Sequence, residues 1–432
     1  MRAPTVFLIA ALPFVLSVLA HSRRHNARSV GFAIPISRRN EIRSEDGAVH
    51  LQRLKANTQQ SIYDILVGFL NFKINTGETH PLADGLDLSH ILGLSKRATG
   101  SVPLVDDSSF LWYGTIQVGT PSESFTVDFD TGSSDIFLPS TKCDTNCDGH
   151  TLYDPSASAS AVDRNKTFKL RYGDGSAVSG EQYRDTVSIA HLTAYNQTLG
   201  AALTYSSGFS ESNFAPDGLV GLGYQSISAY NSPPLFQTLV AQGRVTLPQF
   251  AFKLSNTGAE LYLGGTNSNL YNGSFTYVPV TQQGYWQTIL TGIFINDCPD
   301  FLLNQTSVII DTGTTLIIGN ENDVKAIYAK IPGSQPGPDS GLDEGFFTIP
   351  CNSGTVVSFV FGLKRFPVSW STFNLGQVSA GSDLCVGGII YYPSLDFLDF
   401  WIIGDVFLQN VYTVFDVGEN LIGFADLASP PP

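Results

Sequence analysis

Two copies of the tripeptide Asp-Thr-Gly place carboxyl groups where they could carry out acid–base chemistry. The first copy, residues 130–132, lies in the stretch VDFDTGSSD, and the second, residues 311–313, lies in SVIIDTGTTL. In both, an apolar run typical of a buried strand ends in the Asp, and two hydroxyl residues follow the Gly. A single Asp beside Ser or Thr often only caps its own turn. The matched second copy instead favours a pair of catalytic carboxylates, Asp130 and Asp311.

The two copies also match in their distance from a later motif. Asp130 is followed after 91 residues by Gly221, the end of LVG, and Asp311 is followed after 93 residues by Gly404, the end of IIG. Self-similarity of this kind indicates duplicated structure. We therefore predict two halves of similar build, each presenting one Asp.

The residues next to each Asp could support its carboxylate. The threonines are expected to hydrogen-bond across the junction of the halves, the glycines to permit close backbone approach, and the hydroxyls after them to donate to the carboxylates. These supporting residues are Thr131, Gly132, Ser133, Thr312, Gly313 and Thr314.

Two carboxylates that face each other cannot both ionise cheaply, because their repulsion is strong in a medium of reduced dielectric. They then share one proton, and their pKa values split apart. The ionised carboxylate could take a proton from a water molecule while the protonated one polarises a carbonyl group. That chemistry is peptide hydrolysis without a covalent intermediate, and it predicts activity in acid.

Composition and the N-terminus indicate a secreted globular protein. The chain has 432 residues, of which 43% are hydrophobic and 14% charged, so disorder over most of its length is excluded. Residues 1–20 have the layout of a signal peptide: Met1-Arg2, an apolar run, and polar residues after Ala20. No later segment is apolar over the roughly 18 residues that a membrane span requires. We expect secretion without a membrane anchor, with a vacuolar or lysosomal-type lumen as the alternative.

Residues 21–97 differ from the rest in charge and are predicted to be a propeptide. They contain 11 Lys/Arg and 7 Asp/Glu, whereas residues 98–432 contain 12 and 31. A basic segment could cover an acidic body and be released as carboxylates protonate. The pair Lys96-Arg97 at its end is a candidate processing site, although single dibasic pairs are common on surfaces. The acidic body argues against nucleic acid as a partner.

From residue 98 onward, short β-rich runs alternate with Gly, Asn, Ser and Pro turns, which predicts a mainly-β fold. Helical periodicity is confined to short pieces at residues 61–72, 233–243 and 320–331. Residues 169–180, KLRYGDGSAVSG, predict a β-hairpin with a turn at GDGS.

Five cysteines allow two disulfides and one thiol, with several pairings open from the sequence. The pairing predicted here joins Cys143 to Cys147 and Cys351 to Cys385, and it leaves Cys298 as a buried thiol. No His cluster accompanies the cysteines, which argues against a metal site. Four glycosylation sequons fit a secreted surface: Asn165, Asn196, Asn272 and Asn304.

Taken together, the motifs resemble those of the pepsin-like aspartic proteases, from about Ser109 to Ala428, and their spelling is most similar to secreted fungal members. The motifs are FDTGSS (129–134), YGDGS (172–176), DGLVGLGY (217–224), GYWQ (284–287), IIDTGTT (309–315) and WIIGDVFLQNVYTVFD (401–416). The resemblance implies a bilobal mainly-β fold, with an N-terminal catalytic lobe at 98–282, a C-terminal lobe at 283–432, and a sheet across the base.

The resemblance also implies a long cleft for an extended peptide, pockets for apolar side chains, no metal or organic cofactor, and a monomer inhibited by its own propeptide. It assigns Asp130 and Asp311 as the catalytic pair. It further implies a mobile flap and substrate-binding positions at Tyr172, Gly173, Asp174, Ser176, Leu219 and Tyr285. An ordinary turn-former remains the alternative for Asp174, and ordinary core for Leu219 and Tyr285.

One position departs from the family pattern. Relatives usually carry Trp a few residues after the first catalytic Asp, where its N–H can reach the flap tyrosine, but here the position is Phe137, which has no donor. The Tyr172 hydroxyl must then find water or another partner. Asp135 is expected at the surface, and Asp128 on a strand facing the interior solvent network or the interlobe sheet.

Three alternatives fit the sequence less well. An inactive relative that binds peptides in the same cleft would lack one Asp or have altered Gly or hydroxyl neighbours, and neither is seen. A secreted glycan-binding β-protein would account for the aromatic residues and sequons but not for the duplicated motif. A glycoside hydrolase also uses paired carboxylates, but it does not require Thr-Gly after each and gives no account of the hairpin.

Overall fold

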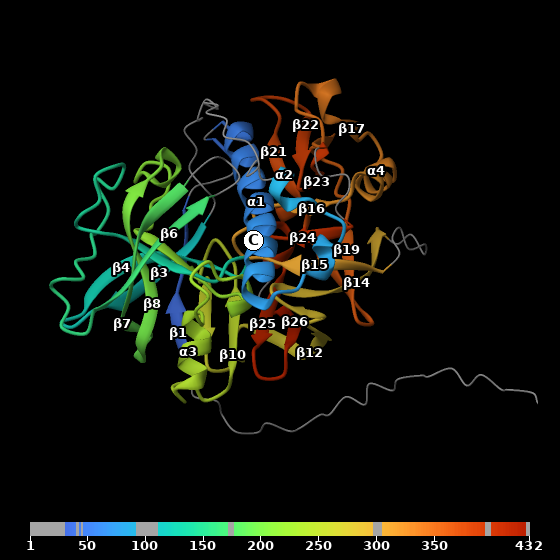
Figure 1. The fold of residues 1–432 in the computed structure, drawn as a ribbon. Helices are drawn as coiled ribbons and strands as arrows, with labels where there is room; N and C mark the ends of the chain where they lie inside the picture. The colour runs from blue at the N-terminus through green and yellow to red at the C-terminus, as the bar shows by residue number, and fades with distance from the viewer. Residues whose placement is uncertain are drawn as a thin grey trace, which may run out of the picture.

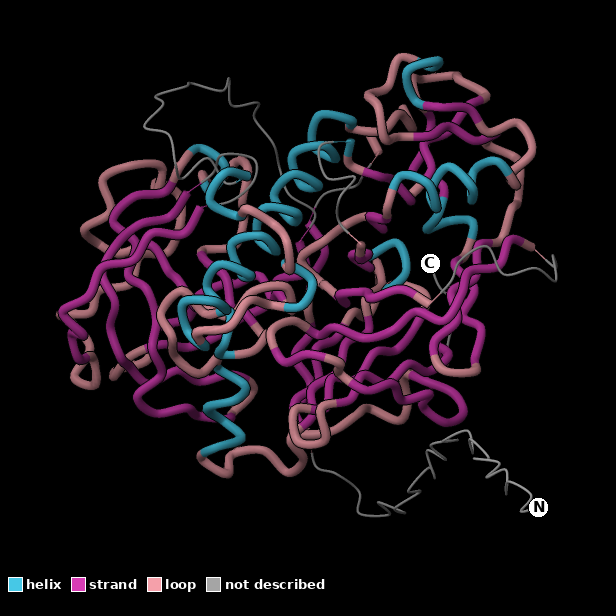
Figure 2. Tube along the Cα trace, turned by 45° about the vertical axis from the view of Figure 1, so that its right-hand side comes forward, coloured by secondary structure: helices cyan, strands magenta, loops and turns pink. Residues whose placement is uncertain are grey.

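The computed structural model of the protein describes residues 31–39, 43–44, 46–91, 111–171, 177–296, 305–393 and 399–428. Two strand-rich lobes lie on either side of a long helix, α1 (Leu51–Thr76), which is drawn in blue at the centre of Figure 1. The view in Figure 2 shows the same helix running between the two lobes. The predicted mainly-β, bilobal architecture is confirmed.

The N-terminal lobe is built on an eight-stranded sheet with the order β2-β3-β4-β9-β5-β8-β7-β6. Its strands are β2 (Ser37–Arg39), β3 (Leu111–Val118), β4 (Glu123–Asp130), β5 (Ile136–Pro139), β6 (Val162–Arg171), β7 (Ala177–Ile189), β8 (Leu192–Tyr205) and β9 (Gly218–Gly221). Strands β6 and β7 pair antiparallel up to Arg171 and Ala177, as the hairpin prediction requires. The turn between them, residues 172–176, lies outside the described residues.

The C-terminal lobe is built on a second eight-stranded sheet, with the order β20-β19-β14-β15-β24-β16-β23 and β13 paired to β14. Its strands are β13 (Gln282–Gln283), β14 (Trp286–Ile295), β15 (Thr306–Ile310), β16 (Ile317–Gly319), β19 (Val357–Phe361), β20 (Lys364–Val368), β23 (Ile389–Tyr391) and β24 (Phe400–Ile403). A smaller sheet in this lobe consists of β17 (Gln335–Pro336), β18 (Phe347–Pro350), β22 (Leu384–Gly387) and β21 (Asn374–Gln377).

A six-stranded sheet combines strands from both parts of the sequence. Its order is β1 (Phe32–Pro35), β11 (Glu260–Leu263), β10 (Gln249–Lys253), β25 (Val411–Asp416), β26 (Leu421–Leu427) and β12 (Tyr271–Pro279). Strand β1 belongs to the predicted propeptide, and it pairs antiparallel with β11. The segment before residue 97 is therefore an integral part of the folded chain.

The predicted helical pieces are confirmed, and each is short apart from α1. The described helices besides α1 are α2 (Leu88–Ile91), α3 (Leu235–Ala241), α4 (Glu321–Ala329), α5 (Trp370–Phe373) and α6 (Asp405–Leu408), and the 3-10 turns are η1 (Pro81–Ala83), η2 (Ser207–Phe209), η3 (Gln225–Ile227) and η4 (Gly337–Ser340). Within the described ranges, none of the helices has the length and apolar character needed to cross a membrane.

The duplication predicted from the sequence is visible in the strand pairing. In the N-terminal lobe, β4 pairs parallel with β9, β9 antiparallel with β5, and β5 parallel with β8. In the C-terminal lobe, β15 pairs parallel with β24, β24 antiparallel with β16, and β16 parallel with β23. Each Asp-Thr-Gly turn thus joins the first and third strands of the same four-strand arrangement.

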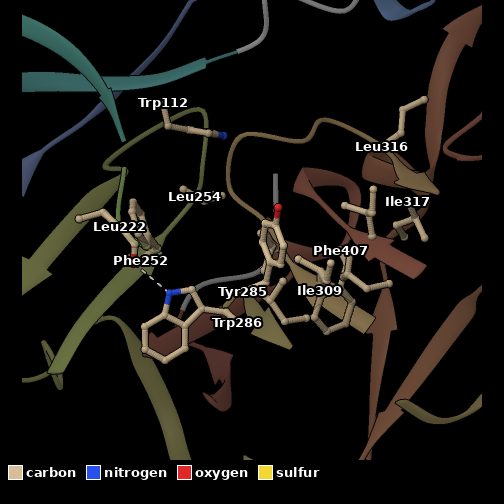
Figure 3. Packing of buried hydrophobic residues seen from close by; sticks show 14 of the residues in the cluster. Trp112, Leu222, Phe252, Leu254, Tyr285, Trp286, Ile309, Leu316, Ile317 and Phe407 are labelled. Carbon is tan, nitrogen blue, oxygen red and sulfur yellow. Dashed lines mark hydrogen bonds between the residues drawn. The ribbon is translucent and has the colours of Figure 1, made fainter. Parts of the chain in front are cut away.

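Buried aromatic and aliphatic side chains, among them Leu222, Trp286 and Ile309, pack together in the core (Figure 3). Trp286 is fully buried, and its indole N–H donates to the Leu222 carbonyl oxygen at 3.0 Å. Because Leu222 follows the N-terminal lobe's LVG motif and Trp286 begins β14, this hydrogen bond ties the two lobes together.

Both predicted disulfides are present, Cys143–Cys147 and Cys351–Cys385. Cys298 and Asn304 lie outside the described residues. Asn165, Asn196 and Asn272 are all exposed, so their side chains are accessible for glycosylation.

Candidate active site

The two Asp-Thr-Gly turns present their carboxyl groups in equivalent ways. Asp130 ends β4, and Asp311 directly follows β15. The amide of Gly132 donates to Asp130 Oδ1 at 2.7 Å, and the amide of Gly313 donates to Asp311 Oδ1 at 2.9 Å. Each turn therefore fixes the orientation of its own carboxylate.

Two buried threonines lock the turns to each other. Thr131 Oγ1 donates to the Ile310 carbonyl at 3.0 Å and accepts from the Thr312 amide at 3.0 Å. Thr312 Oγ1 donates to the Phe129 carbonyl at 2.8 Å and accepts from the Thr131 amide at 3.1 Å. The expected hydrogen bonds across the junction are thus formed reciprocally, and they fix the separation of the halves.

Glycine is required at the centre of both turns because the opposite carboxyl group lies directly over it. A Cβ at Gly132 would fall 2.6 Å from Asp311 Oδ1, and a Cβ at Gly313 would fall 2.5 Å from Asp130 Oδ1. Both distances are shorter than real side-chain contacts. The close approach brings the two carboxyl groups near enough for each to affect the pKa of the other.

The environment of the pair favours one retained proton. Burial raises the pKa of Asp130 above its usual value, while hydrogen bonds to its carboxylate oppose the rise. Burial also raises the pKa of Asp311, and the neighbouring charge of Asp130 raises it further. Burial and the proximity of the two groups therefore favour retention of a proton by the pair.

The hydroxyls that follow the glycines do not act alike. Thr314 Oγ1 donates to Asp311 Oδ2 at 2.6 Å, as expected. Ser133 Oγ is buried and forms no hydrogen bond of ordinary geometry within the described residues, but Ser133 lies close enough to Asp130 to lower the pKa of that carboxyl group. The two halves are therefore similar in backbone but different in how the outer carboxylate oxygens are supported.

Asp128 was expected to face an interior solvent network or the interlobe sheet, and it lines the hollow that also contains Asp130 and Asp311. It belongs to β4 in the N-terminal lobe sheet and is only 2% exposed. Residues two apart on a strand share a face, so Asp128 lies on the same face as Asp130. Burial first, and then the charges of Asp130 and Asp405, hold the pKa of Asp128 well above its usual range.

Asp135 is also buried, which corrects its expected place at the surface. Its carboxylate accepts from Ser228 Oγ at 2.5 Å, from the Ala229 amide at 2.6 Å and from the Tyr230 amide at 3.3 Å. Burial raises the pKa of Asp135 to about 6, although these hydrogen bonds oppose the rise. Asp135 anchors the loop after β9. Because its partners are more than 90 residues away, no local sequence pattern predicts this role.

Helix α1 covers the carboxyl pair. A hollow containing Asp130 and Asp311 is closed on its other side by helix residues Asn57, Gln60, Ser61 and Asp64. Asn57 Oδ1 accepts from the Thr315 amide at 3.2 Å, four residues beyond the second Asp. The helix was expected from periodicity, but its position over the carboxyl pair was not.

The substrate-binding positions are only partly described. Leu219 lines an apolar hollow beside the first turn together with Phe137, Leu170 and Ile227. Tyr285 is fully buried, and its hydroxyl donates to the Ile65 carbonyl of α1 at 2.7 Å. Tyr172, Gly173, Asp174 and Ser176 lie outside the described residues.

Phe137 packs edge to face against Tyr205 and Phe209, with ring centroids 5.9 Å and 5.5 Å apart. It is completely buried. Phe137 therefore makes apolar contacts at the position where the family pattern predicts a hydrogen-bonding indole.

Two residues near the pair were not singled out from the sequence. Trp112 Nε1 donates to Asp405 Oδ2 at 2.7 Å, and both residues are buried. Asp405 lies in the WIIGDVF motif, so the motif itself was the available signal. Within the described ranges, no group of three or more His, Cys, Asp or Glu side chains is placed to hold a metal ion.

The threonine lock yields a stability prediction. Thr131→Val keeps the shape of the side chain but leaves the Ile310 carbonyl and the Thr312 amide unsatisfied in the interior. The free energy of unfolding should fall by about 1–3 kcal/mol, measured by denaturant titration. Thr141→Val, at an exposed threonine, is the matched control and should change it little. Equal stability of both variants would contradict the lock.

The buried carboxyl of Asp128 yields a pH prediction. Since the folded state raises its pKa, ionisation above the unfolded value of 3.8 costs stability. Replacing Asp128 by Asn should therefore shift the relative free energy of unfolding in favour of the variant as the pH rises from about 3 to 7. Asp154→Asn should show the opposite trend, because hydrogen bonds from Ser156 lower the pKa of Asp154. A pH-independent difference for Asp128→Asn would refute its buried ionisable state.

Comparisons with known proteins agree with this geometry. Residues 111–427 match the family model of the eukaryotic aspartyl proteases. An aspartic protease of Phaffia rhodozyma is 44% identical over 335 residues, which cover 77% of this chain and 80% of the relative. Cathepsin E of Rattus norvegicus is 34% identical, covering 75% of this chain and 81% of the relative, and cathepsin D of Dictyostelium discoideum is 34% identical, covering 76% and 86%.

The matched region contains both Asp-Thr-Gly turns and all three large sheets apart from strands β1 and β2. The chain therefore belongs to the eukaryotic, pepsin-like aspartyl protease family and is an aspartic-type endopeptidase.

Proposed function

We propose that the protein is a secreted endopeptidase that hydrolyses peptide bonds of extended polypeptides in acid and is made as a zymogen. The observation that carries this proposal is the closely apposed pair of buried carboxyl groups, Asp130 and Asp311, held by two interlocked turns. Two carboxyl groups with one proton between them supply a base and an acid in the same place.

The proposed reaction uses both groups at once. A water molecule between the carboxyl groups gives a proton to ionised Asp130 as its oxygen attacks the peptide carbonyl carbon. Protonated Asp311 donates its proton to the carbonyl oxygen, so a neutral tetrahedral intermediate forms. Collapse of the intermediate then breaks the C–N bond as a proton passes to the leaving nitrogen. The glycine amides and Thr314 keep both carboxylates oriented throughout.

The position of α1 supports the zymogen. Because Asn57 and Asp64 help to close the hollow over the carboxyl pair, a peptide has no access while the helix is in place. Tyr285, at a family substrate-binding position, is hydrogen-bonded to the helix backbone instead. The chain's own segment before Lys96-Arg97 is thus the proposed intramolecular inhibitor, removed by dibasic or autocatalytic cleavage.

The apolar hollow supports a preference for apolar substrate side chains. Phe137, Leu170, Leu219 and Ile227 line it directly beside the first turn. Since burial of apolar area is the main source of binding energy there, we expect cleavage next to large apolar residues.

The proposed location is extracellular, with a vacuolar or lysosomal-type lumen as the alternative. It is supported by the signal-peptide layout of residues 1–20, the two disulfides and the three exposed sequons. The enzyme is proposed to act as a monomer.

Replacing either carboxyl group tests the mechanism. Asp130→Asn and Asp311→Asn should each reduce peptide cleavage in acid to background, because a neutral amide can neither accept the water's proton nor hold the shared one. The processed enzyme should be assayed on a peptide library between about pH 3 and 6, where one carboxyl of a split pair is ionised.

Asp148→Asn, at an exposed Asp near the Cys143–Cys147 loop, is the matched control and should retain full activity. Circular dichroism should show that all three variants are folded. Near-normal cleavage by folded Asp130→Asn or Asp311→Asn would refute the assignment.

A further inference from the structure

A buried histidine lies where the predicted propeptide meets the body of the enzyme. His80 follows α1 and is 0% exposed. Its Nδ1 accepts from the Leu82 amide at 3.3 Å, which caps the short turn η1. Its Nε2 is buried and has no hydrogen-bond partner within the described part of the chain. The geometry therefore suits a neutral imidazole that uses one nitrogen.

Aromatic rings surround this imidazole. Phe69 stacks on it with ring centroids 4.7 Å apart, and Phe72 and Tyr285 meet it edge to face at 4.9 Å and 6.1 Å. Gly284 closes the remaining side, where a Cβ would lie 3.2 Å from the ring. Phe69 and Phe72 belong to α1, whereas Gly284 and Tyr285 belong to the GYWQ motif of the enzyme. His80 is thus part of the contact that holds the helix in the cleft.

Among the described residues, no charged side chain contacts the ring, so none would stabilise its protonated form. Tyr285 is the titratable side chain in ring contact, and burial holds the pKa of its phenol well above the usual value, so it is neutral. Burial alone lowers the pKa of His80 to about 4. On the segments around His80, Asp64 of α1 is partly buried and lines the catalytic hollow. The other charged side chains there are exposed: Lys73 on α1, Glu78, Asp84 and Asp87 next to His80, and Asp399 before β24.

Among the described residues, ion pairs account for little of the contact between the segment and the body. Lys55 pairs with Asp343, whose side chain is 61% exposed, and Arg43 donates to the carbonyl oxygens of Asn374 and Leu375. Exposed pairs contribute little to stability. The described helix residues over the carboxyl pair are Asn57, Gln60, Ser61 and Asp64, and none is a cation. Protonating the body's carboxylates would therefore remove only a minor part of the attachment.

We propose that His80 is the acid trigger of the zymogen: its protonation places an unpaired cation among aromatic rings and drives the helix out of the cleft. The inference rests on the proposed zymogen function and identifies His80 as the residue that responds to acid. A buried charge without a partner is strongly unfavourable, whereas an exposed imidazolium is fully solvated. Release of the helix is the movement that lets His80 reach water.

The direction of the pH effect follows from linkage. The closed form holds His80 at a lower pKa than the exposed value of 6.5, so the open form binds more protons. The closed form is therefore fully favoured above pH 6.5 and loses its advantage as the pH falls toward 4. The ratio of open to closed molecules should rise by up to tenfold per pH unit, about 300-fold in total.

The test uses the full chain carrying Asp130→Asn, which prevents self-cleavage. Hydrogen exchange of residues 51–76 between pH 7 and 3, corrected for the intrinsic exchange rate, reports opening. The parent should open as the pH falls from 6.5 to 4, whereas His80→Phe, which keeps the ring shape, should stay closed to at least one pH unit lower. His80→Asn keeps an acceptor for the Leu82 amide without a titratable ring and should behave in the same way. The two variants together separate titration from loss of packing.

His50→Phe is the matched control, because His50 precedes the other end of the same helix and is half-buried. It should open at the same pH as the parent. Identical opening midpoints for the parent and both His80 variants would overturn the trigger. An equal shift caused by His50→Phe would overturn it as well.

A second assay separates this inference from the proposed function. Chains with an intact Asp130, with and without His80→Phe, are cleaved after Lys96-Arg97 by an added dibasic-specific protease and purified. Both should then hydrolyse peptides equally, because residue 80 has been removed. If neither hydrolyses peptides, the proposed function fails while the opening data stand. If both do and the opening midpoints coincide, the trigger alone fails.

Discussion

The structure depends on the reciprocal hydrogen bonds of Thr131 and Thr312. Each hydroxyl group reaches into the opposite half, and together they set how closely the two turns approach. Both turns hold their carboxyl groups close together, which supports the proposal that one proton serves both. In each half, a parallel strand pair supports the turn. The glycine at the centre of the turn leaves room for the opposite carboxyl group. The duplicated fold is what makes two equivalent carboxylates available at one point.

Acidic side chains surround the carboxyl pair, and helix α1 covers it. Asp128 and Asp405 lie behind the catalytic pair, and Asp64 of α1 lies in front of it, so the site is rich in acids on both sides. In the part of the chain that the structure describes, the helix is held mainly by aromatic and aliphatic contacts rather than by ion pairs. Apolar contacts do not respond to pH. The buried imidazole of His80 is therefore the group through which the contact between α1 and the body can respond to acid.

Much of this could be predicted from the sequence, because the information is local. The strands, the short helices, the two Asp-Thr-Gly turns and their glycines follow from periodicity and turn chemistry, and the repeat spacing predicted the paired halves. Contacts between distant segments could not be predicted in the same way. Asp135 was expected at the surface, yet it is buried by a loop far away in sequence. The roles of Asp405, Trp112 and His80 likewise depend on contacts with residues that are distant in the sequence, so no local sequence pattern predicts them.

The central claim is that one proton is held jointly by Asp130 and Asp311. It is tested most directly by carbon-13 NMR titration of the aspartate carboxyl groups in the processed enzyme, with the pair assigned from the two Asn variants. The account predicts two well-separated steps, one at or below the usual value of about 4 and one clearly above it. Two independent titrations close to that usual value would show that the carboxyl groups do not share a proton, and the account would be wrong.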